Sequence, residues 1–252
     1  MKYLVLIVAL AAACSLTLAK TVKLPAKWKI CKKNDPKLQE CFKQAANDAV
    51  VSLADGGEQS LGVFPVDPLR MTKLSIDQGS GPVSIDLEFR NMDLKGIKHA
   101  VFREASFDPK TYDMTATVDI KQPLYLDGDY TIRGRVLVLP INGDGKCSLK
   151  LDEPSLKVTQ RGVLVKRGAE TYLNVTDFGF VLDTKKLHLH FENLFNGNKE
   201  LGNTMNTFLN QNSDEVLKEL KPAISDGFGA VFKEISNRVF SKLPLDKIFP
   251  EK

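Results

Sequence analysis

The chain has 252 residues, of which 43% are of hydrophobic type, so it can bury a large core and is not composed like a disordered or fibrous protein. Its 35 basic and 31 acidic residues give a formal net charge of +4 and are interspersed along most of the sequence. Nucleic-acid binding needs clustered lysine and arginine, so we expect no partner of that class.

Residues 1–19 have the parts of a secretory signal peptide. Lys2 gives the positive start, residues 3–13 the apolar core, and residues 17–19 a small-residue cleavage site. This run is too short to span a bilayer, and no later segment is long and apolar enough to do so. We therefore expect a secreted, extracellular protein, a single domain over residues 20–252, with no stable membrane insertion. An uncleaved N-terminal anchor is the alternative.

Secretion determines how the cysteines are interpreted. Cys14 leaves with the signal peptide, and Cys31 and Cys41 close a short loop that we expect to be a disulfide, which contributes about 2–3 kcal/mol. Cys147 then has no partner within the chain. Burial as a small apolar residue is favoured over pairing between chains.

The first predicted element is a helix that follows a basic arm at residues 20–30. Asp35 is placed to cap it, Pro36 takes its first position, and Gly56-Gly57 ends it. Residues 61–69 then form a rigid connector, because they contain two prolines and a glycine.

Alternation of apolar and polar residues predicts β-strands through the middle of the chain. The expected strands cover residues 83–90, 112–120, 130–139, 147–151, 156–165, 171–182 and 185–192. Residues 142–145, Asn-Gly-Asp-Gly, predict a hairpin turn. The short links favour an antiparallel meander.

A long helix is predicted over residues 213–242. Apolar side chains recur there every three or four residues, Ser213 is placed as its N-cap, and Leu243-Pro244 ends it. Pro222 is expected to kink or divide it. A curved sheet wrapped around this helix would cover its apolar face, and any apolar space left between them would be a binding site.

Several features follow one another in a recognisable order. They are the signal peptide, the close pair Cys31 and Cys41 ahead of a helix, the connector Gly62 to Pro68, the segment 139–145, the segment 193–210 and the tail 217–240. Together they resemble the insect takeout and haemolymph juvenile-hormone-binding protein family, and its takeout branch more closely.

The resemblance implies an α+β fold in which a highly curved antiparallel sheet wraps around a long C-terminal helix and encloses an elongated apolar tunnel. It implies a carrier of a small lipophilic ligand, a juvenile-hormone-like terpenoid, fatty acid or other lipid, and not an enzyme. Takeout-like members are linked to feeding, circadian output and chemosensation. The hormone-binding branch has a second disulfide that engages a cysteine near the position of Cys147. Here that partner is missing, which weakens the case for juvenile hormone itself.

A carrier needs apolar walls and one or two polar contacts, and it needs no cofactor or reacting group. The predicted ligand-binding residues lie on inward strand faces and on the long helix: Ile85, Leu87, Phe89, Met114, Val118, Phe178, Phe180, Phe208, Phe228, Val231, Phe232 and Ile235. Ordinary core packing is the competing interpretation for each of them.

The strongest enzymatic alternative is a metal site at His188, His190 and Glu192. These residues project from one side of a predicted strand and match a two-histidine, one-carboxylate ligand set for zinc or iron. A solvated strand face explains the same alternation and is favoured, so we predict no metal. The sequence has no nucleophile elbow and no phosphate-binding loop, and no catalytic residue is predicted.

Two surface features remain open. Asn174, in the sequence Asn-Val-Thr, is an N-glycosylation acceptor whose use depends on exposure of its strand face. The basic arm motivates a second hypothesis, in which bound lipid only stabilises the fold and an outer surface meets a receptor or a membrane. A monomer is expected in either case.

Overall fold

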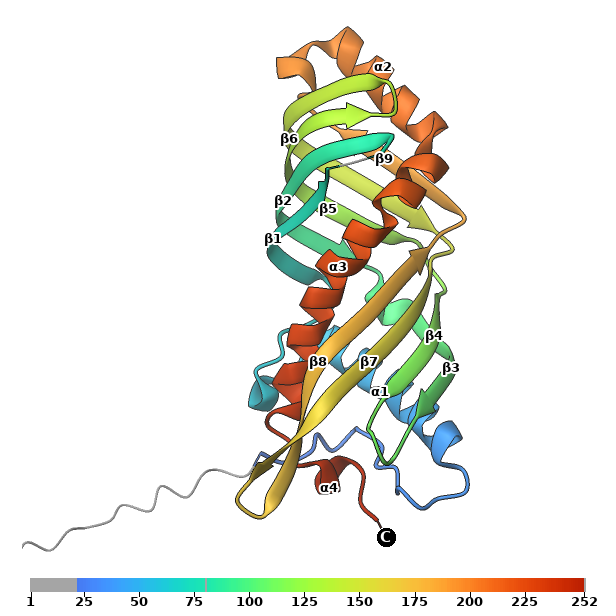
Figure 1. The fold of residues 1–252 in the computed structure, drawn as a ribbon, viewed down its shortest axis with the longest axis vertical. Helices are drawn as coiled ribbons and strands as arrows, with labels where there is room; N and C mark the ends of the chain where they lie inside the picture. The colour runs from blue at the N-terminus through green and yellow to red at the C-terminus, as the bar shows by residue number, and fades with distance from the viewer. Residues whose placement is uncertain (1–21, 80, 252) are drawn as a thin grey trace, which may run out of the picture.

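Two antiparallel sheets and a long C-terminal helix make up an elongated molecule, shown in Figure 1. The computed structural model describes residues 22–79 and 81–251, so the predicted signal peptide lies outside the described residues. The elements are α1 (Leu38–Gly56), β1 (Leu69–Gln78), β2 (Val83–Lys95), β3 (Ala100–Phe107), β4 (Met114–Ile120), β5 (Leu124–Val136), β6 (Leu139–Asp152), β7 (Ser155–Arg167), β8 (Glu170–Asp183), β9 (Lys186–Phe191), α2 (Lys199–Gln211), α3 (Ser213–Phe240) and α4 (Leu245–Ile248). Short 3-10 turns lie at Gln59–Leu61, Ile97–His99 and Phe195–Gly197.

The first sheet has the strand order β1-β2-β5-β6-β9 and the second has the order β3-β4-β7-β8. Four links of two to four residues join the sheets, at residues 96–99, 121–123, 153–154 and 184–185. The predicted single meander is therefore wrong. A short link requires only that consecutive strands meet end to end, and here each of these links passes from one sheet into the other. The two sheets lie one above the other in Figure 1, and α3 runs along both.

The predicted turn at residues 142–145 is also wrong. Strand β6 continues through these residues and pairs with β5, so that Asn142 lies opposite Arg133 and Gly145 opposite Tyr130. The glycines allow close packing instead, because a Cβ at Gly143 would lie 2.5 Å from the Tyr130 hydroxyl oxygen. The chain turns earlier, at residues 137–138.

Both long helices differ from the expectation at their starts. In α1, Asp35 accepts a hydrogen bond from the Lys37 amide at 2.8 Å, but the helix begins only at Leu38. In α3 the N-cap is Asn212 and Ser213 is the first helical residue. Helix α3 is not divided at Pro222, because proline removes a single intrahelical donor and the apolar spacing is the same on both sides of it.

Side-chain amides from the helices pair with the backbone of three edge strands. Asn206 and Asn210 of α2 each donate to and accept from one residue of β9, Phe191 and Leu189, at 2.7–3.0 Å. Gln39 of α1 does the same with Phe107 in β3 at 2.8 and 2.9 Å.

On the fourth strand of the second sheet, Asn237 of α3 pairs with Val175 in β8 at 2.8 and 2.9 Å. These amides satisfy donors and acceptors that a neighbouring strand would otherwise satisfy. They also fix where each helix lies on its sheet.

Replacing Asn237 by Ala should lower the free energy of unfolding by about 1–3 kcal/mol, because both backbone groups of Val175 lose their partner in a half-buried position. Urea unfolding measures the loss. The control is Ser236→Ala on the neighbouring, half-buried position of α3, which should change the stability by less than about 0.5 kcal/mol. A loss no larger than the control's would contradict a structural role for this amide.

Two glycines of α3 let the helix lie close to both sheets. A Cβ at Gly227 would lie 2.8 Å from Leu74 Cδ1 in β1, and one at Gly229 would lie 2.6 Å from the Phe178 carbonyl oxygen in β8. The first neighbour is the end of a side chain and can move. The second is strand backbone, which has much less freedom.

Gly229→Ala should therefore cost about 1–3 kcal/mol of stability, because the added methyl group forces α3 away from β8. Thermal or urea unfolding of the purified protein measures this cost. Gly56→Ala is the matched control, since a Cβ there meets nothing within 4 Å. Equal effects of the two substitutions would show that α3 is not held against β8 in this way.

Candidate functional site

A cavity of about 300 Å³ lies between the two sheets and α3, and all of its lining side chains among the described residues are apolar. The first sheet contributes Leu74, Ile76, Ile85, Leu87, Phe89, Leu94, Leu124, Leu126, Ile132, Val136, Leu149, Leu151, Leu187, Leu189 and Phe191. The second sheet contributes Ala100, Phe102, Val118, Ile120, Leu156, Val158, Phe178, Phe180 and Leu182. The helices and turns add Val50, Ile97, Leu209, Val216, Leu217, Leu220, Ile224, Phe228 and Phe232.

The lining follows from the periodicities of the elements. In β2 the buried residues alternate with exposed or half-buried polar residues, so one face of the strand is directed inward. In α3 the adjacent residues Val216 and Leu217 are followed by lining residues three or four positions apart up to Phe232, so that all share one face. At 1.5 Å per residue these sixteen steps extend about 24 Å, so the lined wall is long.

Four phenylalanines form one rigid side of the cavity. Phe180 of β8 stacks on Phe228 and Phe232 of α3 with ring centroids 5.7 and 5.5 Å apart, and Phe178 stacks on Phe232 at 5.9 Å. Stacked rings fill the space between α3 and β8 without polar atoms.

Eight of the twelve predicted ligand-binding residues line the cavity: Ile85, Leu87, Phe89, Val118, Phe178, Phe180, Phe228 and Phe232. The other four lie elsewhere. Phe208, Val231 and Ile235 are half-buried and pack against the main core. Met114 packs into a second cluster with Phe107 and Tyr112, at the far end of β4. Contact of the eight with a ligand stays a prediction.

The twelve predicted ligand-binding residues leave out most of the residues that line the cavity. Leu187, Leu189 and Phe191 alternate with the two histidines of β9, and this alternation already indicated an inward face. Val216, Leu217, Leu220 and Ile224 belong to the predicted apolar stripe of α3. Leu74 and Ile76 lie on β1, a strand that the sequence did not predict.

The suspected metal ligands lie on the outer face of the first sheet. His188 and His190 are exposed on β9, and His188 Nε2 is 2.8 Å from Asp152 Oδ2. Hydrogen bonds from Lys150 and His188 lower the pKa of Asp152. Within residues 22–79 and 81–251, no group of three or more His, Cys, Asp or Glu side chains is placed to hold a metal ion. The arrangement is that of a solvated strand face.

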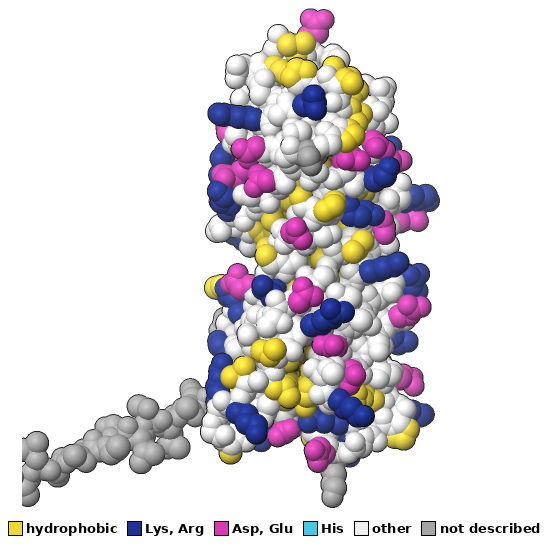
Figure 2. Space-filling model, in the orientation of Figure 1, with side chains coloured by type: hydrophobic (Ala, Val, Ile, Leu, Met, Phe, Trp, Pro, Cys, Tyr) yellow, Lys and Arg dark blue, Asp and Glu magenta, His cyan; other side chains and the backbone are white. Residues whose placement is uncertain are grey.

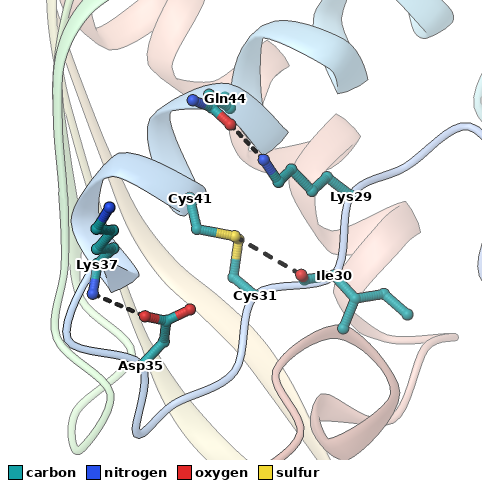
Figure 3. The surroundings of a disulfide bond; sticks show 7 residues. All are labelled: Lys29, Ile30, Cys31, Asp35, Lys37, Cys41 and Gln44. Carbon is teal, nitrogen blue, oxygen red and sulfur yellow. Dashed lines mark hydrogen bonds between the residues drawn. A yellow bond between two sulfur atoms is a disulfide. The ribbon is translucent and has the colours of Figure 1, made fainter.

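The disulfide between Cys31 and Cys41 is present, as predicted, and it ties the N-terminal arm to the first turns of α1 (Figure 3). A hydrogen bond between Lys29 and Gln44 supports the same attachment. Cys147 is free and only 4% exposed. Burial raises the pKa of its thiol to about 12.

The surface mixes charges of both signs. Figure 2 shows lysine and arginine side chains interspersed with aspartate and glutamate over the visible face. Ion pairs join neighbouring strands of the first sheet, such as Lys95 of β2 with Asp127 of β5 at 2.8 Å. No helix of the described residues is long and apolar enough to cross a membrane.

The model of the family described as haemolymph juvenile hormone binding protein matches residues 4–250. The circadian clock-controlled protein daywake of Drosophila melanogaster is 27% identical over 234 residues, which are 89% of this chain and 88% of that protein. A putative beta-carotene-binding protein of Schistocerca gregaria is 21% identical over 218 residues, which are 86% of each. The crystal structure of Epiphyas postvittana Takeout 1 is 28% identical and superposes with a TM-score of 0.74 over 88% of this chain and 99% of that chain.

Asn174 and Thr176 are exposed on β8, so the sequon faces solvent. We expect the protein secreted by insect cells to carry one N-linked glycan, since the acceptor amide of Asn174 is accessible in the secretory pathway. Treatment with an N-glycosidase should shift its mobility on a gel, and Asn174→Gln should remove that shift. Asn34→Gln, at an exposed asparagine outside a sequon, is the control. Secreted chain without a glycan would contradict the prediction.

Proposed function

This chain belongs to the haemolymph juvenile hormone binding protein family, and we propose that it is a secreted carrier of a small hydrophobic ligand. Residues 1–19 are the signal peptide in this proposal, and residues 20–252 are the mature, monomeric carrier. The ligand lies in the cavity between the sheets and α3. Its class is a terpenoid, fatty acid or other lipid with a long hydrocarbon part.

The observation that carries the proposal is the composition of the cavity wall. About 300 Å³ is lined only by apolar side chains among the described residues. Water is stable in a cavity only when it finds two to four polar partners, and this wall offers none from its side chains. Hydrocarbon that enters the cavity leaves bulk water and gains about 25 cal/mol per Å² of apolar surface, less the costs of association.

The names of similar proteins point to the same ligand class. Juvenile hormone names the family and beta-carotene names one relative, and both names support a long apolar ligand for this chain. The long wall along α3 suits such a molecule better than a compact one. The eight predicted residues on the wall are proposed as ligand contacts.

Lipid extracted from the chain purified from its secretion medium, and identified by mass spectrometry, tests the proposal directly. We expect a stoichiometric apolar molecule, or binding of N-phenyl-1-naphthylamine after the lipid is removed. A chain that holds no lipid and also fails to bind this probe would refute the carrier function.

Leu220→Trp should abolish or weaken probe binding at least about tenfold while the protein stays folded, because the larger ring extends into unfilled space. Fluorescence titration and urea unfolding measure the two effects. Leu243→Trp is the matched control, since Leu243 is fully buried and does not line the cavity. It should cost about 1–3 kcal/mol by overpacking. The proposal fails if Leu220→Trp destabilises the protein as much as Leu243→Trp does and leaves probe binding unchanged.

A further inference from the structure

One buried hydroxyl group lacks a hydrogen-bond partner. Ser213 is 1% exposed, and its Oγ is one of two buried side-chain polar atoms in the described residues without a partner, the other being Trp28 Nε1. A buried polar group left unpaired costs about 1–3 kcal/mol. Such groups are rare in folded proteins, and any ligand that supplies the missing bond gains from it.

Ser213 lies beside the cavity at its α2–α3 end, between the lining residues Leu209 and Val216, and is not itself a lining residue. At 100° per residue, the lining residues Val216, Leu217, Leu220 and Ile224 lie within about 60° of Ser213 around the α3 axis. Ser213 is therefore on the centre of the lining stripe, one turn beyond its last members. Trp28 lies on the arm at residues 22–30, none of which lines the cavity, and unlike Ser213 it has no lining residue near it in the chain.

The amide side chains near the α2–α3 end of the cavity already have partners. Asn206 and Asn210 bond to the backbone of β9, and Asn212 donates to the Phe208 carbonyl oxygen at 2.8 Å. The Ser213 hydroxyl keeps its full capacity, one donor and two acceptor positions. Among the described residues, it is a buried polar group at this end that a ligand can engage without breaking an existing bond.

We propose that the Ser213 hydroxyl holds the oxygen-bearing end of an otherwise hydrocarbon ligand at the α2–α3 end of the cavity. This inference rests on the proposed carrier function. The ligand's terminal group is a neutral oxygen, such as an alcohol, ester, aldehyde or ketone. A fatty acid, which the proposed function includes, would bind here in its neutral form, because no described cationic side chain lines the cavity and burying an unpaired charge is costly.

The test compares three probes with the same chain length: hexadecane, hexadecan-1-ol and methyl hexadecanoate. Each displaces N-phenyl-1-naphthylamine from the delipidated full mature chain, which gives its affinity. The variants are Ser213→Ala, which removes the hydroxyl, and Ser213→Thr, which restores one. Ser225→Ala is the control, since Ser225 is half-buried on α3 but lies about 120° from Ser213 around the helix axis, away from the lining stripe.

We expect Ser213→Ala to weaken binding of the alcohol and the ester about five- to tenfold, the value of one hydrogen bond, and to leave hexadecane unchanged. Ser213→Thr should restore the oxygenated probes at least in part, and Ser225→Ala should behave like the unmodified chain. Without ligand, Ser213→Ala should be as stable as the unmodified chain or more so, because it removes an unpaired group.

Two results would overturn the inference. One is a Ser213→Ala variant that binds all three probes like the unmodified chain, or weakens all three equally. The other is a clear loss of stability in the ligand-free variant, which means that the hydroxyl is already paired, for example with a buried water. If the unmodified chain binds hexadecane and either result is found, the carrier function stands and only the role of Ser213 fails. If no probe binds the unmodified chain, the carrier function itself fails.

Discussion

The pairing of edge-strand backbone by helix amides is the constraint on which this architecture depends. A two-sheet body with open edges exposes rows of donors and acceptors that must find partners. Helices α1, α2 and α3 supply them through Gln39, the pair Asn206 and Asn210, and Asn237. The helices are thereby fastened at the edges of the sheets and not at their centres. Space along the middle of α3 can stay unfilled for this reason, and the cavity lies there.

Sequence periodicity predicted most of the strands and the long apolar stripe of α3. It missed β1 and β3, each of which carries an irregularity. The pairing of β1 skips Thr72, and the register of β3 shifts between Phe102 and Glu104, so neighbouring residues fall on the same face. Strand β7 has a similar shift between Arg161 and Gly162, but the alternation on either side of it was long enough to predict the strand. Glycine caused the error at residues 142–145, since Gly143 serves close packing against Tyr130 in a position that the sequence pattern assigns to a turn. Pattern alone does not distinguish these two uses of glycine.

The family and the α+β fold with its long C-terminal helix were predicted from the sequence, and the matches to the family model and to Takeout 1 confirm them. The exact set of residues that line the cavity was not predictable from the sequence. Phe232 and Ile235 occupy the same stripe of α3, yet only Phe232 lines the cavity. Whether an inward side chain meets another side chain or open space depends on the distance between elements, which periodicity does not encode. Ser213 was expected to cap α3 and is instead enclosed at its start.

The position of Cys147 has a chemical consequence for the secreted carrier that we propose. An odd sulfhydryl normally invites exchange with the Cys31–Cys41 bridge or with foreign disulfides, and the attacking species in such exchange is the thiolate. Burial raises the pKa of the Cys147 thiol to about 12 and leaves the residue 4% exposed, which disfavours both the thiolate and its contact with other disulfides. In the proposed secreted protein, this burial protects the Cys31–Cys41 bridge from exchange.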